Sequence, residues 1–173
     1  MWFDLILVAL LVICVITDLR ERKIYNKVLI PFLAIGLILN IAVGGIAGLG
    51  HALAGLAVGF AILLIPYFLG GMGAGDVKLL AVIGGLKGTV FVLTAAVYMA
   101  LAGGILALFV LFFRKGALSR IKQIGNFIGG LRSGVKIPLA LDKDSLNATY
   151  PYGVAIAIGA LAAIVFPSGG GLL

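Results

Sequence analysis

Two aspartates, each placed beside a long apolar run, are the residues of this chain best suited to chemistry. Asp76 lies in the hexapeptide 73–78, Gly-Ala-Gly-Asp-Val-Lys, between two apolar segments, and Asp18 closes the first apolar run. Ionisable groups at membrane depth are costly and commonly mark a function. The chain has only six acidic residues, so two carboxylates at such positions indicate a paired-aspartate hydrolase.

The chemistry of such a pair follows from its shared charge. Two neighbouring carboxylates do not easily ionise together, so the pair should hold one proton between them. One group then activates water as a general base, while the other protonates the carbonyl oxygen of a peptide. Gly70, Gly71, Gly73 and Gly75 precede Asp76. Backbone without side chains there lets a second backbone approach the carboxylate closely.

The composition indicates the elements that position these aspartates. Apolar residues make up 63% of the chain, charged residues 11%, and the mean hydropathy is +1.28. A soluble domain is about half apolar and about a quarter charged. We therefore predict an all-α integral membrane protein that forms a single domain over residues 1–173.

Six apolar segments predict six transmembrane helices, although some are short of the usual length of about 20 residues. A polar loop over residues 114–150 follows the fifth of them, and its apolar residues recur at steps of three and four, which predicts an amphipathic helix on the cytoplasmic interface. Small residues such as Gly55, Gly59, Gly103 and Gly104 indicate close helix packing. Between the fourth and fifth spans, Gly84-Gly85 and Lys87-Gly88 suggest a turn. The six predicted spans are 2–17, 28–43, 51–69, 77–87, 89–113 and 151–166.

The basic residues give the orientation. With six spans, only Lys87 of the thirteen basic residues falls on the side opposite the others. Lysine and arginine concentrate in the cytoplasmic loops of membrane proteins. We therefore predict a protein of the inner (cytoplasmic) membrane with both termini on its outer side. The same rule explains the net charge of +7 without a nucleic-acid partner.

Counting membrane crossings predicts that the aspartates lie at the same depth. Asp18 ends the first span, two crossings follow, and Asp76 begins the fourth span on the same face. The pair forms if the first and fourth helices are neighbours. The lone His51 lies on the opposite face, and Cys14 is the single cysteine, so we expect no nucleophile–histidine pair, no metal site and no cofactor.

Other interpretations stay open for these residues. Asp18 could be a solvated charge in the basic stretch that follows it, and Asp76 could be a helix cap. Lys78 could extend its ammonium group to the interface. The same aspartates could also relay protons in a small proton-coupled transporter, or the chain could be a non-catalytic membrane scaffold.

Three segments resemble one known family. Residues 73–78 resemble the GxGD signature of type IV prepilin peptidases, which are membrane aspartic proteases. The stretch 17–26 resembles the end of that family's first helix, where a catalytic aspartate precedes a basic turn. Pro151-Tyr152-Gly153 resembles the start of its last helix. The resemblance extends over essentially the whole chain.

The resemblance implies a function and roles for the residues. It implies cleavage of the short basic leader from prepilins or pseudopilins at the cytoplasmic membrane face, with Asp18 and Asp76 as the catalytic pair. Gly73 and Gly75 would shape the site, and Lys78 would support it electrostatically. Long members carry a region with paired zinc-binding cysteines and methylate the new N-terminus. The short form, similar to tight-adherence (Flp) pilus peptidases, implies a peptidase without N-methyltransferase activity.

Overall fold

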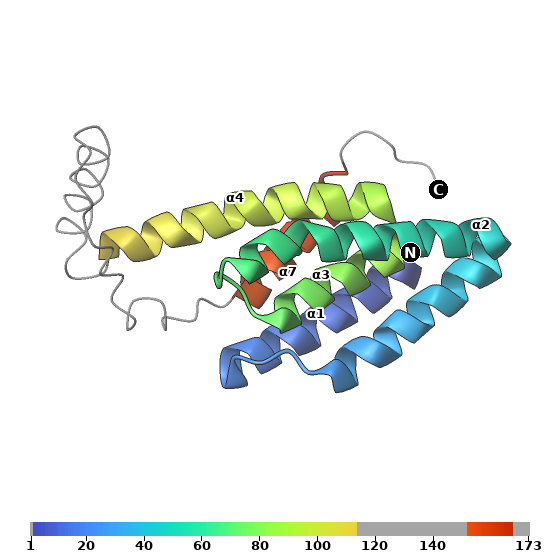
Figure 1. Cartoon of the computed structure of the whole chain (residues 1–173), viewed down its shortest axis with the longest axis horizontal. Coiled ribbons are helices and arrows are strands. Elements are labelled where there is room, and N and C mark those ends of the chain that lie inside the picture. The colour runs from blue at the N-terminus through green and yellow to red at the C-terminus, as the bar shows by residue number, and fades with distance from the viewer. Residues whose placement is uncertain (1, 114–151, 168–173) are drawn as a thin grey trace. The chain divides into compact units, whose positions relative to one another are not determined.

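The computed structural model describes residues 2–113 and 152–167, with side chains for 2–106 and 152–167. These residues form helices and contain no strand, which confirms the predicted all-helical class (Figure 1). The predicted amphipathic helix, the basic residues of the 114–150 loop and Pro151 lie outside this part of the chain. The described helices are α1 (Trp2–Glu21), α2 (Asn26–Phe68), α3 (Ala74–Lys87), α4 (Thr89–Phe113) and α7 (Tyr152–Val165).

Three of these helices are long and apolar enough to cross a membrane. They are α1, α2 and the Thr89–Leu106 part of α4, whereas α7 is apolar but shorter. Large hydrophobic side chains on the outer faces are exposed, for example Trp2, Ile46 and Phe68. An apolar exterior of this kind fits lipid rather than water. The chain is therefore a membrane protein, while the topology of six spans stays a prediction.

Helix α2 covers two of the predicted spans and the connection between them. The backbone leaves the helical region at one residue only, Gly45, where φ is 58° and ψ is −140°. Glycine adopts positive φ without the steric cost that a Cβ would bring. The two arms on either side of Gly45 run in opposite directions (Figure 1). A predicted connection over 44–50 is thus replaced by a single sharp break.

Helix α3 is the most deeply buried helix among those described. Ten of its 14 residues are buried, and it contacts α1, α2 and α7. Gly84 and Gly85, which the sequence suggested as a turn, lie inside α3. The turn into α4 is at Gly88, where φ is 84°. A Cβ on Gly84 would overlap the carbonyl oxygen of Gly55, so this glycine serves close packing of α2 on α3.

The predicted packing role of small residues is thus confirmed for Gly55 and Gly59 and stays a prediction for Gly103 and Gly104. Gly55 and Gly59 of α2 both lie against the backbone of α3. On α4, a Cβ at Gly103 would make an ordinary contact of 3.8 Å with Ala155, and one at Gly104 would meet nothing within 4 Å. Among these four glycines, Gly55 and Gly59 lie where the backbones of two helices touch, so glycine permits the close spacing of α2 and α3 there.

Candidate active site

Asp18 lies inside the bundle because it continues the buried face of α1. Leu7, Leu11, Cys14 and Asp18 follow one another at intervals of three or four residues, and all are buried. This spacing places them on one side of a helix. The helix continues past Thr17 to Glu21, so Asp18 lies within α1 and not in a loop after it. Only 7% of Asp18 is exposed, which argues against a solvated loop charge.

Asp76 is held at the first turn of α3. Its Oδ2 accepts a hydrogen bond of 3.1 Å from the backbone N–H of Gly73, the residue that precedes the helix. This contact is half of a capping box, so the cap interpretation holds in part. Yet Asp76 is also 8% exposed, which is unusual for an acidic residue whose only task is capping. The residue both caps α3 and presents a carboxylate in the interior.

The N-terminus of α7 provides a further partner that sequence reasoning missed. The backbone N–H of Gly153 donates a hydrogen bond of 3.1 Å to Oδ2 of Asp18 in a buried setting. The positive end of a helix dipole adds to this stabilisation of the carboxylate. A Cβ at Gly153 would lie 2.6 Å from the same oxygen. The motif Pro151-Tyr152-Gly153 was the signal in the sequence, but it did not disclose the donor.

Asp18 and Asp76 are 58 positions apart in the sequence, yet they lie on helices that touch. Helix α1 contacts α3 directly, and both carboxylates are buried. Gly75 brings the start of α3 against the connection from α1 to α2, since a Cβ there would lie 2.9 Å from Cβ of Ile24. The structure thus brings together Asp18, Asp76, Gly73 and Gly75.

Lys78, the remaining residue of the predicted site, makes a different contact. It is exposed, and its Nζ donates a hydrogen bond of 3.1 Å to Oδ1 of Asn26, the first residue of α2. The side chain therefore links the starts of α2 and α3 at the rim of the site.

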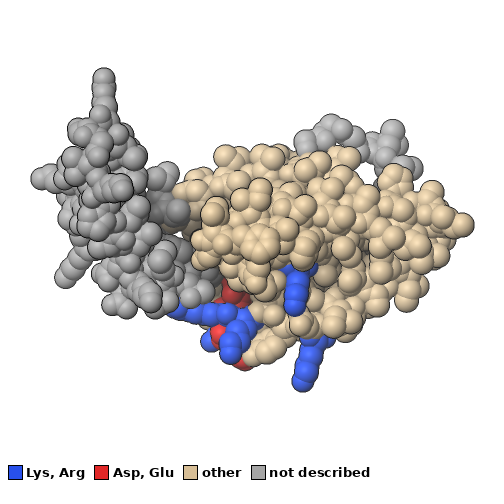
Figure 2. All heavy atoms as spheres, in the orientation of Figure 1, with Lys and Arg blue, Asp and Glu red and all other residues tan. Residues whose placement is uncertain are grey.

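Basic side chains surround this end of the bundle. Arg22 directly follows α1 with a positive φ of 52°, and its backbone N–H donates to the carbonyl oxygen of Asp18 at 2.9 Å. Figure 2 shows lysine and arginine side chains gathered beside acidic ones on part of the visible face. The exposed basic residues near the two aspartates in sequence are Arg20, Arg22, Lys23, Lys27 and Lys78.

The chemistry that these groups offer is proton transfer. Two buried carboxylates, each held by a backbone N–H group, can serve as a base and an acid on either side of a reacting carbonyl. Within the described ranges, no group of three or more His, Cys, Asp or Glu side chains is arranged to hold a metal ion.

Comparison with known proteins agrees with the resemblance seen in the sequence. Residues 5–113, which include both aspartates, match the type IV leader peptidase family. A protein of Bacillus subtilis (strain 168) described as "Prepilin leader peptidase/N-methyltransferase" is 35% identical over 103 residues. That match covers 58% of this chain and 41% of the relative, so this chain spans less than half of the relative's length. No solved structure gives a significant match.

Proposed function

The chain belongs to the type IV leader peptidase family, and on that basis we propose that it is an aspartic endopeptidase that removes the short basic leader from prepilin-like substrates. The observation that carries the proposal is that Asp18 of α1 and Asp76 of α3 are both buried on helices that contact each other. Asp76 belongs to the GxGD segment, and Asp18 precedes the basic stretch 20–23. The relative from Bacillus subtilis is also named as a leader peptidase.

The proposed reaction is hydrolysis with water as the nucleophile. One aspartate, in its ionised form, takes a proton from water while the oxygen attacks the carbonyl carbon of the scissile peptide. The other aspartate, which holds the shared proton, donates it to the carbonyl oxygen. The tetrahedral intermediate then collapses as the C–N bond breaks. The first aspartate gives its proton to the leaving amine, and the second regains one from the hydroxyl group.

The neighbouring residues take supporting roles in this proposal. Gly73 holds Asp76 through its N–H group, and Gly75 permits the close approach of Ile24. Lys78 supports the site by tying the start of α3 to Asn26. The lack of side chains at Gly73 and Gly75 leaves backbone on which an extended peptide can lie.

The setting of the reaction is part of the proposal. We place the aspartate pair at the cytoplasmic face of the inner membrane, with six spans, both termini outside and residues 1–173 forming one peptidase domain in the bilayer. The basic residues around the aspartates support this orientation. The apolar helix of a prepilin or pseudopilin would remain in the bilayer while its leader reaches the site.

The test is cleavage of a leader-bearing pilin by the purified chain in detergent or liposomes. Asp18→Asn and Asp76→Asn should each reduce the rate by about 10³-fold or more, because each removes an acid–base group. Glu21→Gln is the matched control, since Glu21 lies at the same end of α1 but binds Tyr25. Cleavage that survives both aspartate substitutions refutes the proposal. Ion flux without cleavage would favour a transporter instead.

We propose that these 173 residues catalyse peptide hydrolysis and do not catalyse methyl transfer. Their single cysteine, Cys14, is buried in α1, so they contain no paired-cysteine zinc site of the kind implied for the long relatives. Mass spectrometry of the cleaved pilin, with S-adenosylmethionine supplied, should show an unmodified new N-terminus. A mass increase of one methyl group would overturn this part.

A further inference from the structure

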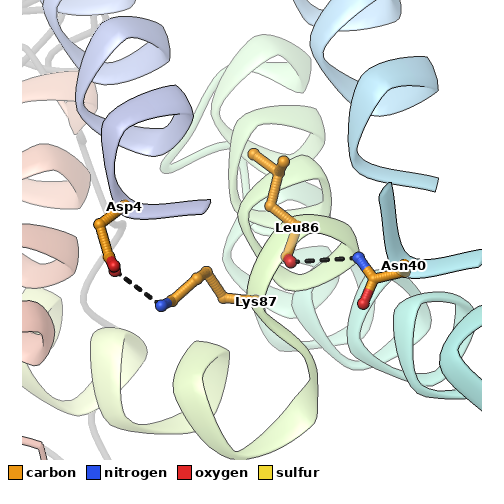
Figure 3. Close-up of polar contacts among 4 residues, drawn as sticks. All are labelled: Asp4, Asn40, Leu86 and Lys87. Atoms are coloured by element: carbon orange, nitrogen blue, oxygen red, sulfur yellow. Dashed lines mark hydrogen bonds and ion pairs between the residues drawn. The ribbon is translucent and has the colours of Figure 1, made fainter. Parts of the chain in front are cut away.

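The end of α3 that lies away from Asp76 is held by polar side chains from two other helices. Lys87 Nζ donates to Oδ1 of Asp4 in α1 at 2.7 Å (Figure 3), and it also lies 5.1 Å from the ring centre of Phe91. Asn40 of α2 donates through Nδ2 to the carbonyl oxygens of Gly85 and Leu86, each at 3.3 Å. We call Asp4, Asn40 and Lys87 the far-end clamp.

The clamp and the aspartate pair join the same two helices at opposite ends. Asp18 follows Asp4 by 14 residues, which is about 21 Å along α1. Lys87 follows Asp76 by 11 residues, which is about 16 Å along α3. These two lengths differ by about 5 Å, a gap that the four-carbon side chain of Lys87 spans. The helices run antiparallel, so the two contacts form together in one register.

The register matters because the aspartates sit on different helices. A slip of α1 along α3 by one residue changes their relative height by about 1.5 Å, and a displacement of about 1 Å can lower a rate by roughly 100-fold. Interdigitated apolar side chains restrict such sliding, and a directional polar contact adds to that restraint. An ion pair with a short Nζ–Oδ1 distance has a defined geometry.

The clamp residues are placed to provide that directional contact. The side chains of Lys87 and Asp4 are 22% and 35% exposed, so water screens their attraction only in part. Asn40 Nδ2 donates to the carbonyl oxygen of Gly36 in α2 at 2.8 Å and shares its other hydrogen between Gly85 and Leu86. It thus links α2 to carbonyl groups that the end of α3 leaves without intrahelical partners. Lys87 then holds α1 to the C-terminal end of α3, which Asn40 already joins to α2.

We propose that the far-end clamp sets the axial register of α1 against α3 and thereby the separation of Asp18 and Asp76. Asp4, Asn40 and Lys87 are positioning residues that do not touch the substrate. The catalytic consequence rests on the proposed peptidase function, whereas the structural consequence does not.

The structural consequence is measured by cross-linking without any substrate. Cysteines replace Asp18 and Asp76 in a chain that also carries Cys14→Ala, and methanethiosulfonate reagents of graded length bridge them. With the far-end clamp intact, the reagent of one particular length should bridge the two cysteines fastest. Lys87→Gln or Asp4→Asn should shift the optimum to another length or abolish the preference. The charge-exchanged variant with Asp4→Lys and Lys87→Asp should restore it.

The catalytic consequence is measured with the native aspartates in place. Lys87→Gln should lower kcat by about 10- to 100-fold with KM within about twofold, because the chemical step needs the register and leader binding does not. Lys87→Arg and the charge exchange should recover most of kcat. Asn40→Ala should act in the same direction. Thr94→Ala, which removes a hydrogen bond within α4, is the control and should leave cross-linking unchanged.

The outcomes separate the two proposals. An unchanged length preference in both Lys87→Gln and Asp4→Asn overturns the clamp, whatever their activity. A lowered kcat that neither Lys87→Arg nor the charge exchange restores also overturns it. If Lys87→Gln does not fold, the charge-exchanged and Lys87→Arg variants decide by the same two measurements. If the unmodified chain cleaves no pilin, the peptidase proposal fails while the cross-linking result still stands.

Discussion

The two ends of α3 are joined to α1 by opposite kinds of contact. At one end lie the buried acidic side chains of Asp76 and Asp18, and each carboxylate accepts a hydrogen bond from a backbone N–H group. At the other end, Lys87 and Asp4 form an ion pair between side chains. The same two helices therefore bring like charges together at one end and opposite charges at the other.

This difference bears on how a fold can hold two buried carboxylates on touching helices. A backbone N–H group orients a carboxylate and carries no full charge, whereas a buried lysine beside Asp18 or Asp76 would favour the ionised form. The basic side chains at this end, such as Arg22 and Lys78, are exposed. At the other end, where we propose no chemistry, an ion pair joins the two helices directly.

The largest effect is expected in the middle of α3, where a change disturbs both ends at once. Gly84→Ala places a Cβ against the backbone carbonyl of Gly55, and overpacking of this kind costs about 3 kcal/mol. The unfolding temperature in detergent should fall steeply and activity should be lost. Gly85→Ala is the control, because its Cβ would meet Leu33 Cδ1 at 3.1 Å and that side chain can move. Equal behaviour of the two variants would contradict the packing account.

The second change affects the aspartate end alone. Gly153→Ala puts a Cβ 2.6 Å from Oδ2 of Asp18, which displaces either the carboxylate or the start of α7. We expect cleavage to fall about 100-fold, with an unfolding temperature near that of the unmodified chain. Gly103→Ala, whose Cβ would contact Ala155 at 3.8 Å, should retain activity. Full activity of Gly153→Ala would show that the hydrogen bond to Asp18 has no part in catalysis.

A smaller loss is expected from the approach of Ile24 to α3. Gly75→Ala would bring two Cβ atoms to 2.9 Å, so the connection between α1 and α2 has to move slightly. Cleavage should fall by about tenfold, since the start of α3 shifts by less than about 1 Å. Gly71→Ala, whose nearest atom would be the oxygen of Pro66 at 3.4 Å, provides the comparison. If both variants cleave at the same rate, this contact does not position Asp76.

The smallest effect is expected at the exposed rim. Lys78→Met removes the hydrogen bond to Asn26, and an exposed bond of this kind contributes about 0.5 kcal/mol. Cleavage should change by no more than about twofold at that energy, and Asn26→Ala should give the same result. A much larger loss with Lys78→Met than with Asn26→Ala would mean that the ammonium group acts on the site through its charge.

The sequence allowed the aspartates to be singled out and their depth to be predicted. The counting of crossings depended on apolar run lengths, which are a strong signal in membrane proteins. It placed Asp18 and Asp76 on one face, and in the structure their helices are in contact. The roles of both residues in catalysis remain predictions.

Other features had no readable signal. Gly153 acts through its backbone N–H, which every residue except proline possesses. Gly84 was interpreted as part of a turn because glycine often marks one, yet its partner Gly55 becomes apparent only when the helices are assembled. Asp4 and Lys87 are 83 positions apart, and neither lies in a motif. Contacts between distant helices depend on the packing of the whole bundle.

The short length of α3 has a consequence for the access of water. Its 14 residues rise about 21 Å, whereas the hydrocarbon layer is about 30 Å thick. Ten of these residues are buried by neighbouring helices, so protein rather than lipid surrounds α3. A helix of this length ends below at least one membrane surface. Where that end is the first turn of α3, water would reach Asp76 from the near surface without a channel through the protein.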